Sequence, residues 1–292
     1  MRERLERAPT LHAALVTAYQ FQARIRRTGT GPRVLANGMP KSGTHLLSTL
    51  LANLPRLRFS GRHYSFDDFR SSTAVRSRSD ATLDWKRLQR AIQAVNRGQY
   101  MTAHFPSTGR LVEILNALDF KTVVIFRDPR DVVVSNAFYI AKESRHWLHD
   151  YFVSEVPDLP ARILTCIRGV RAPEGQRGLE SIGGRLNRQA GWREEQSCYV
   201  THFEDLVGPS GGGTERAQLR EIKAIADHIH HPLTESELLT LAGRTWDDRS
   251  PTFRKGSAGS WIDHFSEAHK DAFKEVAGQQ LIDLGYETNL DW

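Results

Sequence analysis

Two strand–loop–helix units constrain the fold of this 292-residue chain more than any other feature. The first is the short apolar run Arg33–Met39, followed by Pro-Lys-Ser-Gly-Thr and by leucines at helical spacing over His45–Leu54. The second is Lys121–Phe126, followed by Arg-Asp-Pro-Arg and a helical segment from Asp131 to Glu143. Repeated units of this kind predict parallel strands joined by crossover helices.

Further segments extend the same alternation along the chain. Apolar runs at Tyr100–Phe105 and Cys198–Phe203 predict two more strands. Residue spacing predicts helices at Trp85–Asn96, Thr214–Ile229 and Thr234–Ala242. We therefore expect an α/β fold with a mostly parallel central sheet, helices on both faces and a P-loop-like turn after the first strand.

The expected organisation is an N-terminal helical arm at residues 1–30 and a single domain at residues 31–292. Leu5–Ile25 fits a helix that is broken around Pro9. Two roles fit this arm: packing on the body, or peripheral contact with a membrane surface. Gly208–Gly213 contains three consecutive glycines and is predicted to be a flexible surface loop within the domain.

Composition indicates the charge of the ligand and the compartment. Forty Lys and Arg residues against 34 Asp and Glu residues give a net charge of +6, which suits an anionic ligand. Cys166 and Cys198 are the only cysteines, too few for a disulfide framework or a zinc site. No apolar run approaches the roughly 18 residues that cross a bilayer, and the N-terminus lacks the apolar core of a signal peptide. We expect a cytoplasmic protein without a transmembrane segment.

The turn after the first strand, Gly38–Thr44, carries the strongest chemical signal. It leads into a helix, whose first N–H groups and dipole favour an anion. Lys41 adds a positive charge, and Ser42 and Thr44 add hydroxyl donors around Gly43. The spacing differs from the Walker motif, because Lys41 precedes Ser-Gly. An ordinary glycine-containing turn is the alternative interpretation.

A second candidate anion site follows the strand at Lys121–Phe126. Arg127 closes this strand, and Ser135 lies about two turns into the next helix. Both side chains can serve one phosphate group. The alternative is a solvated ion-pair cluster of Arg127 with Asp128, Arg130 and Asp131, which would contribute little to stability.

A third segment near the C-terminus, Phe253–Trp261, places Arg254 and Lys255 beside Gly256. Glycines permit close approach of the backbone to a ligand, and the two cations suit a phosphate. The alternative is a basic surface turn that Trp261 anchors to the core. The residues alone leave both interpretations open.

These three segments, in this order, resemble the family of sulfotransferases that use 3′-phosphoadenosine-5′-phosphosulfate (PAPS). The resemblance covers the chain from Val34 to the C-terminus. It implies that Lys41–Thr44 holds the 5′-phosphosulfate and that Arg127 and Ser135 hold the 3′-phosphate. It also implies that the loop Arg254–Trp261, with its Arg-Lys-Gly-x-x-Gly-x-Trp pattern, covers that phosphate.

The resemblance also implies a catalytic base and an adenine clamp. His104, in Ala-His-Phe-Pro, is similar to the family's His-Leu-Pro segment, whose histidine takes the proton of the acceptor. Phe203 and Trp246, the latter beside Thr245, correspond to contacts with adenine, although each aromatic ring also suits the core. His45 completes the donor loop, where many members carry threonine.

Other departures limit what the resemblance transfers. Leu46 replaces an adenine-side tryptophan, so the stacking of the nucleotide is not transferred in detail. Thr102 stands where many members have lysine, which leaves Lys41 alone to neutralise the leaving group. The dimerisation motif of animal members is not recognisable around Lys270–Ala277, so the oligomeric state is not transferred.

The implied reaction is in-line transfer of a sulfuryl group from PAPS to a hydroxyl, less readily an amine, of a small-molecule, glycosidic or lipid acceptor, with no metal expected. Aromatic residues at His63–Phe69 and Tyr139–Phe152 are expected to line the acceptor pocket. Two alternatives remain open. One is an atypical P-loop phosphotransferase, although no Walker-type aspartate is evident; the other is a non-catalytic polyanion-binding protein, although no nucleic-acid motif is recognisable.

Overall fold

The protein is represented by a computed structural model that describes residues 31–70, 83–171, 178–246 and 256–292. The predicted N-terminal arm and the predicted ligand residues Arg254 and Lys255 lie outside the described residues. Among the residues that are described, no helix is both long and apolar enough to cross a membrane.

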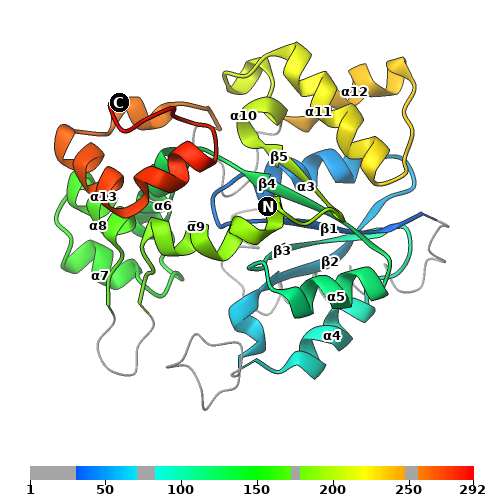
Figure 1. The fold of residues 1–292 in the computed structure, drawn as a ribbon, viewed down its shortest axis with the longest axis horizontal. Helices are drawn as coiled ribbons and strands as arrows, with labels where there is room; N and C mark the ends of the chain where they lie inside the picture. Colours follow the sequence, from blue (N-terminus) through cyan, green and yellow to red (C-terminus); the bar gives the residue numbers. More distant parts are fainter. Residues whose placement is uncertain (1–30, 71–82, 172–177, 247–255) are drawn as a thin grey trace, which may run out of the picture.

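A five-stranded parallel sheet forms the centre of the molecule (Figure 1). The strands are β1 (Arg33–Gly38), β2 (Arg58–Ser65), β3 (Gln99–His104), β4 (Phe120–Phe126) and β5 (Cys198–His202). Their spatial order is β2-β3-β1-β4-β5, and every neighbouring pair is parallel. The α/β fold class predicted from the sequence is therefore confirmed.

Helices cover both faces of the sheet because residues along each central strand alternate between two cores. Val34 and Ala36 of β1 belong to one core, and Leu35 between them belongs to the other. Helices on the first side are α3 (Thr44–Asn53), α10 (Phe203–Leu206), α11 (Glu215–His228) and α12 (Glu235–Thr245). Helices on the opposite side are α4 (Trp85–Gln93) and α5 (Gly109–Ala117), together with the 3-10 turn η1 (Phe66–Phe69).

A third group of helices packs around its own apolar core beside the sheet (Figure 1). Its members are α6 (Pro129–Lys142), α7 (His149–Ser154), α8 (Leu159–Arg168), α9 (Ile182–Ala190) and α13 (Glu267–Asp283). Helix α6 starts directly after β4 and is buried along most of its length, including Val132, Val133 and Val134. Side chains on α6 are therefore held rigidly between the sheet and the helical group.

The Gly208–Gly213 segment lies within the domain and is largely at the surface, as predicted, since Pro209, Ser210 and Gly212 are exposed. It contains a short 3-10 turn, η4 (Pro209–Gly211), in which Gly211 is buried. The Ala258 N–H donates to Gly211 O at 2.9 Å, and a Cβ on Gly211 would lie 2.6 Å from the Trp246 ring. Glycine is required here by close packing, so this turn supports the neighbouring C-terminal segment.

Candidate functional site

A cleft of about 750 Å³ opens where β1, β3 and β4 end. The carboxyl edge of a parallel sheet is the usual place for a ligand in an open α/β fold. With the exception of Ser42, every predicted site residue that the structure describes lines this cleft: Lys41, Gly43, Thr44, His45, His104, Arg127, Ser135, Phe203, Thr245, Trp246 and Gly256. Residues far apart in the sequence are thus brought together at one site.

The loop between β1 and α3 presents unused hydrogen-bond donors. Lys41 and Gly43 both adopt left-handed backbone conformations, with φ values of 73° and 105°. The N–H groups of Gly43 and Thr44 have no acceptor among the described residues, as is usual in the first turn of a helix. The Thr44 hydroxyl is also buried without a partner. This arrangement suits an anion at the start of α3.

Ser42 lies beneath the loop rather than along the cleft. Its N–H donates to Met39 O at 3.0 Å, and its hydroxyl is buried without a partner. A Cβ on Gly38 would lie 2.6 Å from that hydroxyl oxygen and 2.8 Å from Ile125 O. Glycine at position 38 therefore lets the loop close tightly over the sheet.

Lys41 places its charge at the mouth of this loop. Its Nζ lies 4.2 Å from the centroid of the Tyr139 ring, which belongs to α6. A cation at this distance is attracted to the ring face. The contact holds the side chain against α6, at the border of the cleft.

Arg127 connects the donor loop to the C-terminal segment. Its Nη2 donates to Ser257 O at 2.9 Å, and its Nη1 lies 3.5 Å from Lys41 O. Its guanidinium carbon lies 4.2 Å from the Phe203 ring centroid. The Nε is buried without a partner, and Ser135 lines the same cleft two turns along α6. These groups form a second cluster that suits an anion, distinct from the β1–α3 loop.

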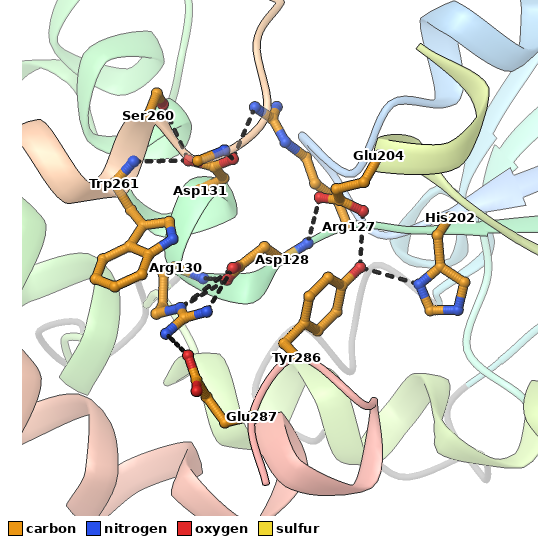
Figure 2. Close-up of polar contacts among 11 residues, drawn as sticks. Arg127, Asp128, Arg130, Asp131, His202, Glu204, Ser260, Trp261, Tyr286 and Glu287 are labelled. Carbon is orange, nitrogen blue, oxygen red and sulfur yellow. Dashed lines mark hydrogen bonds and ion pairs between the residues drawn. The ribbon is translucent and has the colours of Figure 1, made fainter. Parts of the chain in front are cut away.

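Asp131 anchors the C-terminal segment beneath this second cluster (Figure 2). Its carboxylate is fully buried and accepts from Gly259 N at 2.9 Å, Ser260 Oγ at 3.0 Å and Trp261 N at 2.8 Å. It also lies 3.5 Å from Arg127 Nη2. Trp261 anchors the segment to the body, so this part of the alternative interpretation was correct.

We expect the Asp131→Asn substitution to lower the free energy of unfolding by about 3 kcal/mol, because buried donors lose a charged acceptor. Urea denaturation measures this change. The matched control is Asp119→Asn, because Asp119 makes only an exposed ion pair with Arg97, worth less than about 1 kcal/mol. Equal losses in the two variants would contradict the anchoring role.

The charged residues after β4 are buried and not solvated, which corrects the ion-pair alternative considered from the sequence. Asp128 caps α6 by accepting from Arg130 N at 2.9 Å, and its carboxylate also pairs with the Arg130 guanidinium at 2.8 Å. The Arg130 guanidinium lies 3.8 Å from the Trp261 ring and 4.6 Å from the Trp292 ring. Both carboxylates that follow β4 are thus engaged in structural contacts.

Glu204 ties α10 to the same network (Figure 2). It accepts hydrogen bonds from Asp128 N and from the Tyr286 hydroxyl, each at 3.0 Å. The Tyr286 oxygen also lies 3.0 Å from His202 Nδ1. Burial raises the pKa of Glu204 to about 7. The network fixes the end of β5 against the start of α6.

His104 ends β3 and lines the cleft. Its Nδ1 lies 2.6 Å from Gly38 O. Because a carbonyl oxygen only accepts, Nδ1 carries the proton in the neutral ring and Nε2 keeps its lone pair. Burial, followed by the nearby His63 and Lys41 charges, lowers the pKa of His104 to about 4, although the Gly38 hydrogen bond opposes this shift. The ring is therefore neutral at pH 7.

His63 packs edge-on against His104, with ring centroids 4.8 Å apart. Its Nδ1 lies 2.9 Å from Thr102 Oγ1. Burial lowers the pKa of His63, while the charge of Asp68 opposes this effect. Thr102, at the position where the family often has lysine, thus supports a ring that packs against His104.

Phe203 and Trp246, the two aromatic residues predicted to contact adenine, and the neighbouring Thr245 all line the cleft. Phe203 lies against Gly43, where an added Cβ would come within 2.7 Å of the ring. Trp246 lines the cleft and packs partly into the core of α3 and α12. The Thr245 hydroxyl is occupied, because it donates to Leu241 O at 2.7 Å. Phe203 and Trp246 are thus both core and cleft residues.

The aromatic segments predicted for the acceptor are divided between the cleft and the core. They contribute five ring-bearing side chains to the cleft: His63, Phe66, Tyr139, His146 and Trp147. Phe69 and Phe152 are buried in separate cores instead.

Sequence reasoning missed one wall of the cleft, which consists of Arg185, Arg188 and Gln189 on α9. The consecutive residues Gly183 and Gly184 disguise the start of this helix. The available signal was the spacing of Arg185, Arg188 and Gln189, which share a helical face.

The fold and the cleft define an α/β protein with a loop of unpartnered hydrogen-bond donors at the carboxyl edge of a parallel sheet. The protein-family model described as "Sulfotransferase domain" matches residues 32–165. Sulfotransferase 6B1 of Danio rerio is 24% identical over 182 residues, which cover 55% of this chain and 52% of that relative. Sulfotransferase 2A6 of Mus musculus is 23% identical over 209 residues, which cover 62% and 63%. The chain thus matches less than two thirds of the length of either relative.

Two solved structures share the fold. Mouse sulfotransferase SULT7A1, complexed with 3′-phosphoadenosine-5′-phosphate (PAP), superposes with a TM-score of 0.58 at 17% identity, covering 87% of each chain. Retinol dehydratase, in a complex with retinol and PAP, gives a TM-score of 0.55 at 18% identity, covering 91% of this chain and 86% of that one. In sequence and in fold the chain is therefore similar to sulfotransferases, although the domain model matches a little under half of it.

Proposed function

We propose that the protein transfers the sulfuryl group of PAPS to the hydroxyl of a small molecule. The observation that carries this proposal is that one cleft holds two separate groups of unpartnered donors, one in the β1–α3 loop and one around Arg127. PAPS carries charged groups at its 5′ and 3′ positions. A nucleotide with phosphate at only one of these positions would use only one of the two sites.

For the donor, the free N–H groups of Gly43 and Thr44 and the Thr44 hydroxyl suit the 5′-phosphosulfate. Arg127, through its unpartnered Nε, and Ser135 suit the 3′-phosphate. We assign Arg254, Lys255 and Gly256 to the same phosphate on the family resemblance. Phe203 and Trp246 would contact adenine, with Thr245, His45 and Ser42 supporting the site.

PAPS supplies an electrophilic sulfur with a phosphate leaving group. His104 Nε2 accepts the proton of the acceptor hydroxyl as its oxygen bonds to sulfur and the bond from sulfur to the 5′-phosphate oxygen breaks. Lys41 and the loop N–H groups stabilise the charge that develops on the departing phosphate. The neutral ring of His104 suits this role, because its proton already lies on Nδ1.

The acceptor side of the proposal rests on the composition of the cleft. Phe66, Tyr139 and Trp147 offer apolar surface for a small organic molecule. Retinol dehydratase, which has the same fold, is in a complex with one such molecule, retinol. A cytoplasmic location remains part of the proposal. The phosphotransferase alternative is disfavoured, because Asp128 and Asp131 are engaged by Arg130 and the C-terminal segment and are not free to position Mg²⁺.

Incubation with sulfur-labelled PAPS and pooled metabolites tests the proposal. We expect label to appear in one or a few compounds together with an equal amount of PAP. Transfer from phosphorus-labelled ATP instead, in a Mg²⁺-dependent reaction, would contradict it in favour of a phosphotransferase.

A pH titration tests the proposed state of His104. Its pKa is lowered from 6.5 to about 4, so we expect its NMR resonances in nucleotide-free protein to titrate near pH 4. Because the unfolded state binds the proton more readily, His104 also makes the folded state less stable as pH falls from 6.5 towards 4. The resonance is assigned by its absence from the His104→Ala variant, and a midpoint near 6.5 would contradict the assignment.

A further inference from the structure

Helix α9 brings an additional charged surface to the cleft, on the side next to the proposed base. Gln189 Nε2 donates to Phe105 O at 3.2 Å, and Phe105 directly follows His104. Ser107 N donates to Arg188 O at 2.8 Å. Two hydrogen bonds therefore fix the C-terminal half of α9 against the segment that carries His104.

Arg185 lies one helical turn before Gln189 and lines the same cleft. Its Nη2 donates to Cys166 O at 3.0 Å, whereas its Nε is buried without a partner. Among the described residues, no carboxylate lies within ion-pair distance of Arg185. The charge of Glu180 raises the pKa of Arg185, but Glu180 forms its ion pair with Arg188, at 3.5 Å.

The charge of Arg185 is not balanced by a carboxylate among the described residues. A guanidinium removed from water needs an opposite charge, and without one its burial is costly. Burial accordingly lowers the pKa of Arg185. Gln189 adds a second unsatisfied group, because its buried Oε1 has no hydrogen-bond donor. Apart from Arg188, which pairs with Glu180, the wall thus offers one cation and one hydrogen-bond acceptor.

Neither group belongs to the proposed donor site. The donor phosphates have their own partners on the β1–α3 loop and around Arg127, which come from other elements of the fold. Gln189 is instead tied to the segment of His104, where the acceptor must lie for its proton to be removed. The unpaired charge of Arg185 is therefore available to the acceptor.

We propose that the acceptor carries an oxyanion, namely a carboxylate or a phosphate or sulfate ester, that pairs with Arg185 while a donor group of the acceptor bonds to Gln189 Oε1. This inference rests on the proposed sulfuryl transfer. It adds a charge requirement to a cleft whose aromatic residues alone would favour neutral molecules. Carboxylate, phosphate and sulfate groups suit a guanidinium because two of its N–H groups can bind two of their oxygens.

The test compares two probes of similar shape, phenylacetate and phenylacetamide, by calorimetry on protein saturated with PAP. Saturation occupies the donor phosphate sites, so the anionic probe reports on the remaining cleft. We expect phenylacetate to bind about tenfold or more tightly than phenylacetamide, as one charged hydrogen-bonded pair implies. We also expect Arg185→Gln to abolish this preference.

Arg168→Gln is the matched control, since Arg168 is an exposed arginine on the adjacent α8 that is 4.0 Å from Glu275. It should retain the wild-type preference. Equal binding of the two probes, no binding of phenylacetate, or a preference that persists in Arg185→Gln would overturn the inference. Binding of PAP is measured in a separate titration, and failure to bind PAP contradicts the proposed donor. The comparison of the two probes is also repeated without PAP, and an Arg185-dependent preference for phenylacetate there still supports the anion subsite.

Discussion

The His104→Ala variant is expected to lose activity by about 10²–10⁴-fold in kcat, the usual contribution of a general base. The imidazole is neutral at pH 7, its proton is fixed on Nδ1 by Gly38 O, and Nε2 has no partner among the described residues. Without the ring, the acceptor hydroxyl must lose its proton to water. Steady-state kinetics with the acceptor identified by labelling measures the loss.

Binding of PAP distinguishes a lost base from a damaged fold. His104→Ala should bind PAP with nearly wild-type affinity, because His104 does not belong to either proposed phosphate site. His230→Ala serves as the control for removal of a histidine, since His230 is exposed. Turnover by His104→Ala within about threefold of wild type would remove His104 from the mechanism.

The Lys41→Met variant is expected to lower kcat by about 10²–10³-fold, which is typical for the loss of one group that stabilises developing charge. Methionine keeps most of the aliphatic stem beside Tyr139 but removes the cation. Thr102 cannot compensate, because it is neutral and hydrogen-bonded to His63. The KM for PAPS should change less than kcat, since the charge on the 5′-phosphate grows in the transition state.

Lys142→Met provides the matched control, because Lys142 lies exposed at the end of α6, the helix that carries Tyr139. It should retain wild-type kinetics. If Lys41→Met raised KM while leaving kcat unchanged, Lys41 would bind the donor without assisting departure of its phosphate.

The strands and helices next to the donor loop were predictable because their apolar residues are continuous and periodic. The segment Lys121–Phe126 was predicted as a strand, and β4 begins one residue earlier, at Phe120. Strand β2 was not predicted, because Arg58–Ser65 combines polar and charged residues with Gly61 and lies at an edge of the sheet. Local patterns therefore identified the central strands and the edge strand β5, but not the polar edge strand β2.

The donor side of the cleft was also accessible from sequence because its residues sit in short motifs. The role of Arg185 could not be predicted from the sequence. It depends on the hydrogen bond to Cys166 O, on the distance of Arg185 from acidic groups and on the packing of α9. Likewise, the burial of Asp131 depends on the return of Gly259–Trp261 from the far end of the chain. Such long-range contacts leave no local pattern.

The central claim, that the cleft holds a nucleotide phosphorylated at both 3′ and 5′ positions, is tested most directly by calorimetric titration with PAP and with AMP. The two ligands differ only by the 3′-phosphate, for which Arg127 and Ser135 are available. The account predicts that PAP binds at least about 100-fold more tightly than AMP, equivalent to about 2.8 kcal/mol. Equal affinities for PAP and AMP would contradict it.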